Sequence, residues 1–95
     1  MEQIKAVIVD FSGDGDGITA LYLDGLLHTY GDYYHDKISE QISGFLDGVK
    51  YVLGDDNVIE SSINLHEKHP LIEDTWDVGN PPPNNLSDID EDEGK

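Results

Sequence analysis

The first 30 residues divide into three apolar runs separated by turn residues. The segments 2–11, EQIKAVIVDF, and 18–24, ITALYLD, are rich in β-branched and other apolar residues, and each predicts a strand. The pair Asp24-Gly25 then favours the type I′ turn of a two-residue β-hairpin. Residues 26–30, LLHTY, therefore predict a third strand running back beside the second, which completes a three-stranded meander.

The segment 36–53, DKISEQISGFLDGVKYVL, has the strongest periodic pattern and predicts a helix. Its apolar residues recur at helical spacing and are expected to form one buried face: Ile38, Ile42, Phe45, Leu46, Val49, Val52 and Leu53. Gly54 is typical of the position just beyond a helix end. Asp32 or Asp36 is expected to cap the start of the helix, where a carboxylate also favours the helix dipole.

After the turn GDDN, the segment 57–66, NVIESSINLH, predicts a fourth strand with one buried face, to which Ile59, Ile63 and Leu65 contribute. The order β-β-β-α-β is typical of an α+β fold. We therefore expect residues 1–70 to form one small α+β domain, a mostly antiparallel four-stranded sheet covered by a single helix.

Composition changes at Pro70, beyond which lie the other three prolines and a final run of acids. Residues 80–95 predict a disordered acidic C-terminal tail. Residues 71–79, with Trp76, either dock on the open sheet face or stay unstructured until a partner binds. The first predicted strand has apolar residues on both sides, so a cover for the second face is expected. The tail or a second copy would supply it, which leaves monomer and homodimer open.

Charge dominates the composition of the chain. Its 95 residues include 21 Asp and Glu against 5 Lys and no Arg, a formal net charge of −16, and residues 1–70 alone carry −9. This charge repels nucleic acids and anionic membranes, so the expected partners are basic proteins or cations. The chain has no cysteine, which suits a reducing cytoplasm, and no signal peptide or membrane-spanning run is evident.

Carboxylates on the predicted helix form a row. Asp36, Glu40 and Asp47 fall on one side, about 6 Å and about 10 Å apart along the axis, a spacing compatible with nucleic-acid phosphates. A solvated face of an acidic protein explains the same row. The expected partner-binding carboxylates lie on helix, turns and fourth strand: Asp14, Asp16, Asp24, Asp32, Asp36, Glu40, Asp47, Asp55, Asp56 and Glu60.

The glycine-rich segment 12–17, SGDGDG, invites a metal or phosphate interpretation. It matches an EF-hand loop only in part, because Ser12 and Leu23 stand where that loop needs carboxylates. Asp14 and Asp16 would repel a phosphate, and no lysine follows. We expect a hairpin tip that displays two carboxylates, with a weak surface calcium site as the alternative.

Catalytic and zinc-binding patterns are weak. His28, His66 and His69 could join a carboxylate around zinc, but HEKH lacks the spacing of the zincin motif, and isolated surface histidines are the simpler interpretation. No serine lies in a nucleophile-elbow motif. We therefore expect no enzyme, cofactor or metal.

The stretches LYLDGLLHTYGDYYHDKI and ISGFLDGV, within an acidic chain without cysteine or arginine, are similar to small proteins of phages that infect Gram-positive bacteria. The chain resembles the small acidic host-takeover proteins of lytic bacteriophages, more narrowly the Bacillus phage DNA mimics that inhibit the nucleoid-associated protein HU. The resemblance implies occupation of the DNA-binding surface of a basic host protein in the host cytoplasm, without direct nucleic-acid binding. Two alternatives remain: a non-mimic inhibitor of a host enzyme or defence nuclease, and a metal-binding regulator.

Overall fold

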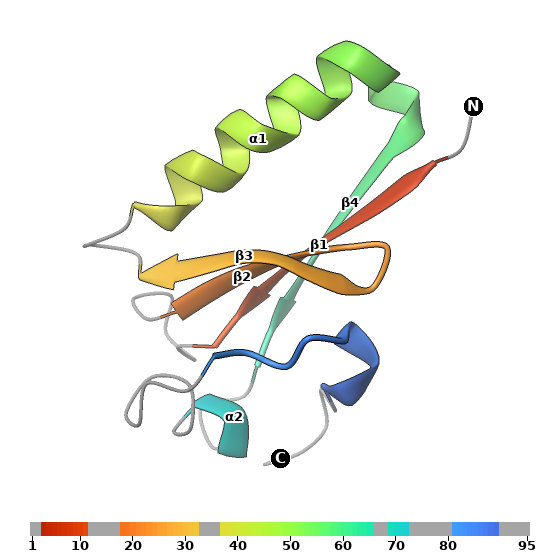
Figure 1. Ribbon diagram of the computed structural model, residues 1–95. Coiled ribbons are helices and arrows are strands. Elements are labelled where there is room, and N and C mark those ends of the chain that lie inside the picture. Colours follow the sequence, from red (N-terminus) through yellow and green to blue (C-terminus); the bar gives the residue numbers. More distant parts are fainter. Residues whose placement is uncertain (1–2, 12–17, 33–36, 66–68, 73–80, 90–95) are drawn as a thin grey trace.

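The computed structural model describes residues 3–11, 18–32, 37–65, 69–72 and 81–89. Within these ranges four strands form one sheet in the order β3-β2-β1-β4, and the long helix α1 crosses one face of it (Figure 1). The elements are β1 (Ile4–Asp10), β2 (Ile18–Leu23), β3 (Leu26–Asp32), α1 (Ile38–Leu53) and β4 (Val58–Asn64). The predicted α+β class, with a four-stranded sheet and one main helix, is confirmed.

The first three strands form the expected antiparallel meander. β1 pairs with β2, and β2 pairs with β3 across a turn in which Asp24 has φ 51° and Gly25 has φ 87°. A type I′ turn requires positive φ at both central residues, which aspartate tolerates and glycine adopts freely. The Asp-Gly hairpin is therefore confirmed in position and in geometry.

β4 makes the sheet mixed. It pairs in parallel with β1, from Ile4 opposite Val58 to Asp10 opposite Asn64. The reason is the long connection through α1, which carries the chain from β3 at one edge of the sheet to the opposite edge (Figure 1). A crossover of this length permits the parallel arrangement that a short hairpin forbids. The sheet is thus antiparallel in its meander and parallel at β4.

α1 starts later than the pattern indicated. Its N-cap residue is Lys37, in the left-handed region at φ 50°, and the Lys37 carbonyl accepts hydrogen bonds from the N–H groups of Glu40 and Gln41. The predicted cap at Asp32 is wrong, because Asp32 still belongs to β3 and lies opposite Ile18 of β2; the other candidate, Asp36, lies outside the described residues. No helix in the described ranges is long and apolar enough to cross a membrane.

Each face of the sheet has its own apolar cluster. The cluster between α1 and the sheet contains Ala6, Leu21, Ile38, Ile42, Leu46 and Val58, and the cluster on the opposite face contains Val7, Val9, Phe11, Ala20, Tyr22 and Leu65. The expected two-sided burial of the first strand is confirmed. The predicted buried face of the fourth strand is confirmed for Ile63 and Leu65, which pack on the side away from α1, and is wrong for Ile59, which is 43% exposed. Val58 in addition packs toward α1.

The C-terminal part of the chain covers the second face. Leu71 and Ile72 of α2 (Pro70–Ile72) pack there, together with Leu86 and Ile89 (Figure 1). Of the two alternatives for residues 71–79, docking holds for Leu71 and Ile72, while residues 73–79 with Trp76 lie outside the described part of the chain and stay open. The chain itself therefore provides the cover that a second copy could have provided.

Residues 81–89 are also tied to the meander by hydrogen bonds. The Tyr22 hydroxyl donates to the Pro83 carbonyl at 2.6 Å, the Leu27 N–H donates to the Asn84 carbonyl, and the Leu86 N–H donates to the Gly25 carbonyl. This placement differs from the disorder expected over 80–95, because apolar side chains interrupt the polar run and reach the sheet. Residues 80 and 90–95 lie outside the described part, and disorder there stays a prediction.

Candidate protein-interaction surface

Most of the expected partner-binding carboxylates that the structure describes lie near the two ends of the sheet, whereas Asp47 lies within α1 and Glu60 within β4. Asp24 follows β2, and Asp55 and Asp56 form most of the 3-10 helix η1 (Asp55–Asn57), which leads into β4 at the same end. Asp32 closes β3 at the opposite end, where Glu40 lies in the first turn of α1. The three remaining candidates lie outside the described residues: Asp14, Asp16 and Asp36.

Exposed acidic residues also lie along α1, which runs between the two ends of the sheet. Glu40 and Asp47 are exposed on α1, about 10 Å apart along the axis, and Asp55 and Asp56 are exposed just beyond its last turn. We call these four residues the acidic row. A DNA duplex carries one charge per about 1.7 Å of axis, or about six over the distance from Glu40 to Asp47. The acidic row can therefore match selected phosphates of a duplex but not its full charge density.

Asp24 and Glu60 are bound to partners inside the chain. The Asp24 carboxylate accepts the Lys5 backbone N–H at 3.0 Å, and the Lys5 carbonyl accepts the Asp24 N–H at 2.9 Å, which extends the pairing of β1 with the hairpin. Glu60 forms an ion pair of 2.5 Å with Lys50 of α1. Both carboxylates thus contribute to the fold as well as to the surface charge.

Lys50 is a cation in acidic surroundings. Its hydrogen bond to Glu60 raises the pKa of Lys50, and the charges of Asp47 and Asp55 act in the same direction. Lys50 therefore stays fully protonated and offsets part of the charge that the C-terminal half of α1 presents.

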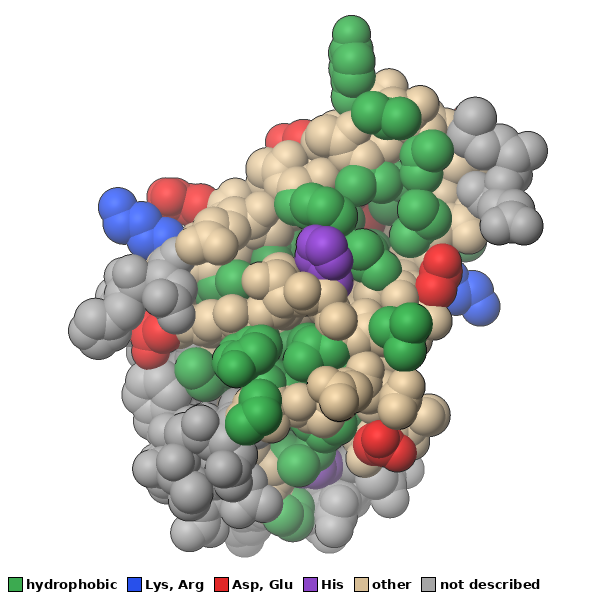
Figure 2. Space-filling model, in the orientation of Figure 1, with side chains coloured by type: hydrophobic (Ala, Val, Ile, Leu, Met, Phe, Trp, Pro, Cys, Tyr) green, Lys and Arg blue, Asp and Glu red, His purple; other side chains and the backbone are tan. Residues whose placement is uncertain are grey.

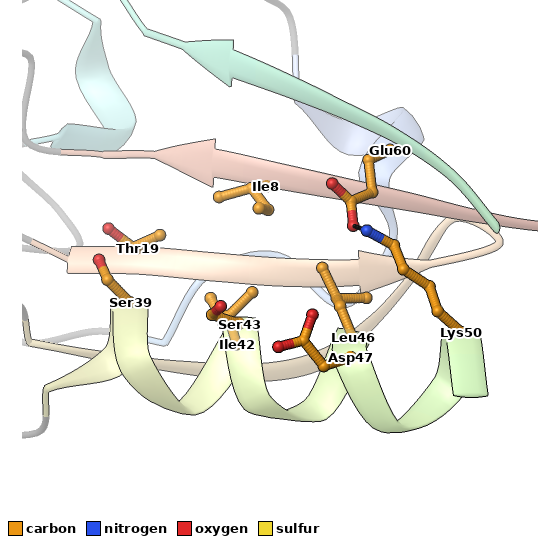
Figure 3. A pocket seen from close by; sticks show the side chains of 9 residues that line it. All are labelled: Ile8, Thr19, Ser39, Ile42, Ser43, Leu46, Asp47, Lys50 and Glu60. Atoms are coloured by element: carbon orange, nitrogen blue, oxygen red, sulfur yellow. Dashed lines mark ion pairs between the residues drawn. The ribbon is translucent and has the colours of Figure 1, made fainter. Parts of the chain in front are cut away.

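A cavity of about 250 Å³ lies between α1 and the sheet (Figure 3). Thr19 and Ser39 flank it at one end, the Lys50–Glu60 ion pair closes the other, and Ile42 lies between them. Ligand sites usually have volumes of about 300 Å³ or more. Its lining combines aliphatic side chains and hydroxyl groups with Asp47 and the ion pair, and the described lining residues include no histidine or thiol that could activate a nucleophile.

The described histidines are separated by the sheet. His28 stacks on Phe45 of α1, with ring centroids 4.4 Å apart, whereas His69 directly precedes α2 on the opposite side. The expectation of a surface position is wrong for His69, which is 1% exposed, and its Nδ1 accepts the Leu71 N–H. One zinc ion cannot bind both rings, because its ligand distances are about 2 Å. The described residues contain no group of three or more potential metal ligands.

Large side chains are exposed on the C-terminal part of α1, as the helical spacing indicated for Tyr51 but not for Val52. Val52 was expected on the buried face of the helix and is 75% exposed, and Tyr51 is 92% exposed. Figure 2 shows hydrophobic side chains gathered along the C-terminal part of α1. Gly44 and Gly48 were the sequence signal for this open flank, because small residues at this spacing leave one side of a helix uncovered.

Comparison with protein-family models, curated proteins and solved structures gave no match to this chain.

Proposed function

We propose that this chain is a DNA-mimicking inhibitor, which acts without catalysis and occupies the DNA-binding surface of a basic host protein in the host cytoplasm. The observation that carries the proposal is the acidic row, four carboxylates exposed along α1 and past its end, on a chain of net charge −16. Long-range attraction to a basic surface speeds the encounter, and contact releases counterions. The resemblance to phage takeover proteins makes HU the first partner to test.

The test is competition for purified HU between this chain and a short labelled DNA duplex. Increasing amounts of the chain should release the duplex, and the affinity of the chain for HU should fall steeply between about 0.05 M and about 0.3 M salt. Failure of the duplex to compete, or an affinity independent of salt, would refute mimicry. If HU does not bind, the same competition is run with the basic DNA-binding proteins of host lysate.

A matched pair of variants tests the acidic row. Asp47→Asn removes one charge from the row, and Asp88→Asn removes one charge from the C-terminal segment on the other face of the sheet. We expect Asp47→Asn to weaken binding about two- to fivefold and Asp88→Asn to change it less. Equal effects would mean that total charge governs binding and that the row does not.

The exposed apolar residues favour a second candidate function, a protein-binding inhibitor that does not replace DNA. Tyrosine and aliphatic side chains are typical of the buried centre of protein interfaces, and Tyr51 and Val52 are largely exposed. In this case the chain would bind a host enzyme or defence nuclease, and DNA would not displace it. The competition experiment therefore separates the two functions.

A further inference from the structure

An apolar groove follows the flank of α1 that faces away from β4. It has a volume of about 530 Å³ and is lined by Ile4 of β1 and by α1 residues that include Gly44, Phe45, Gly48, Val49 and Val52. Phe45 and Val49 are partly buried against the sheet, whereas Val52 projects into solvent. The groove thus borders the helix-side core and remains open to the outside.

The two glycines make close approach to α1 possible. Gly44 and Gly48 are one helical turn apart, and a Cβ atom added to either would meet nothing within 4 Å. The backbone of α1 is therefore accessible between the walls formed by the larger side chains. From Gly44 to Leu53 the groove extends about 14 Å along the helix, which corresponds to between two and three turns of a second helix.

The exposed carboxylates of α1 and η1 favour a positively charged partner for the groove. Glu40 and Asp47 are exposed on α1, with Asp47 toward the flank that lines the cavity facing β4, and Asp55 and Asp56 are exposed just past Leu53, at the end of the groove. A second copy of the chain also carries a formal net charge of −16, and the repulsion between two such chains opposes self-association through the groove. A segment with an apolar stripe and flanking lysines or arginines complements both the groove and the acids.

We propose that the groove binds a cationic amphipathic α-helix of a partner protein. Its apolar residues occupy the groove over Gly44 and Gly48, and its basic residues meet the acidic row. The inference rests on the proposed function in taking the partner to be basic, and it adds an apolar anchor that a DNA backbone does not have. Binding should then combine a salt-dependent part from the carboxylates with a part that persists at high salt.

The probe is a synthetic helical peptide of leucine and lysine with all its leucines on one side. A peptide of the same composition with its leucines distributed around the helix is the comparison. Fluorescence anisotropy with the full chain, at about 0.15 M and about 0.5 M salt, gives both affinities. We expect the amphipathic peptide to bind about tenfold tighter or more, and to keep this preference at the higher salt. Equal binding of the two peptides would overturn the proposal.

We expect Gly48→Leu to fill the groove and keep the fold, because a Cβ atom added at Gly48 meets nothing within 4 Å and leucine is a better helix former than glycine. Ser43→Leu is the matched control, since it adds the same side chain at an exposed position on the other flank of α1. Gly48→Leu should abolish the preference for the amphipathic peptide, and Ser43→Leu should retain it. A preference that survives in Gly48→Leu would overturn the proposal.

Sedimentation of the full chain tests whether a second copy occupies the groove. A dimer that dissociates in Gly48→Leu would assign the groove to self-association and overturn the proposal, whereas a monomer in both proteins supports it.

DNA competition distinguishes DNA mimicry from helix binding in the groove. If DNA displaces the chain from its partner while Gly48→Leu has no effect on peptide preference, only the groove proposal fails. If the groove preference holds while DNA does not compete, only mimicry fails.

Discussion

Replacement of Tyr22 by Phe probes the attachment of residues 81–89 to the sheet. The Tyr22 side chain is fully buried, and its hydroxyl donates to the Pro83 carbonyl at 2.6 Å. The variant keeps the ring and loses this hydrogen bond. A single hydrogen bond contributes about 1 kcal/mol to the free energy of unfolding. At neutral pH we therefore expect Tyr22→Phe to be less stable than the wild type by about 1 kcal/mol.

At alkaline pH the order should reverse. Burial, and to a smaller extent the charge of Asp88, raises the pKa of Tyr22 from 10.0 to about 12. Because the folded state holds the phenol proton more tightly than the unfolded chain, this contribution to stability is complete below pH 10 and is lost as pH rises through about 12. A shift of two units corresponds to about 2.7 kcal/mol. Tyr22→Phe lacks this loss, so the two stability curves should cross near pH 11.

Urea unfolding followed by far-UV circular dichroism, from pH 7 to about pH 11.5, measures both curves. At the upper limit the wild type should be less stable than Tyr22→Phe by about 1 kcal/mol. Asp88→Asn is the control, because it keeps the hydrogen bond, removes the charge and should reduce the alkaline loss. A constant difference between wild type and Tyr22→Phe over this range would refute the burial of Tyr22 beneath residues 81–89.

Three further predictions concern stability and association. Leu86→Ser should lower the free energy of unfolding by about 1–2 kcal/mol in the same urea assay, because the leucine packs on the second sheet face. An unchanged free energy of unfolding would contradict this packing. Gly25→Ala should cost about 1–2 kcal/mol because of its φ of 87°, whereas Gly48→Ala in α1 should gain about 1 kcal/mol; effects of the same sign would contradict the turn geometry. Lys50→Met removes a cation from its carboxylate neighbours and should speed association with HU in stopped-flow measurements; slower association would contradict an electrostatically steered encounter.

The elements that the sequence predicts well are those determined by neighbouring residues. The Asp24-Gly25 turn is recognisable because few residue pairs adopt positive φ twice in succession. The end of α1 at Gly54 follows from the same property, since Gly54 has φ 93° and its N–H bonds the Lys50 carbonyl. The helix start was harder to place, because Lys37 occupies a conformation that lysine rarely adopts.

The features that the sequence did not reveal depend on contacts between distant residues. The parallel pairing of β4 with β1 leaves no local signature, since a strand that borders either kind of neighbour has the same alternation. The burial of His69 and the exposure of Val52 depend on where α2 and α1 lie over the sheet. Periodicity assigned Val52 to the buried face, although its side chain lies on the open flank of α1 that lines the groove. Of the candidate site, the sequence located the acids but not the apolar groove beside them.

The position of β1 in the sheet has a consequence for folding kinetics. β1 is synthesised before the other three strands, and its meander with β2 and β3 requires only local contacts. The other neighbour of β1 is β4, which starts 54 residues after the start of β1. The segment that covers the second face of β1 comes later still. Pairings so distant in sequence slow folding, because loop closure must precede them. During synthesis on the ribosome, β1 therefore keeps an unpaired edge until β4 has emerged, and an uncovered apolar face until residues 71–89 have emerged.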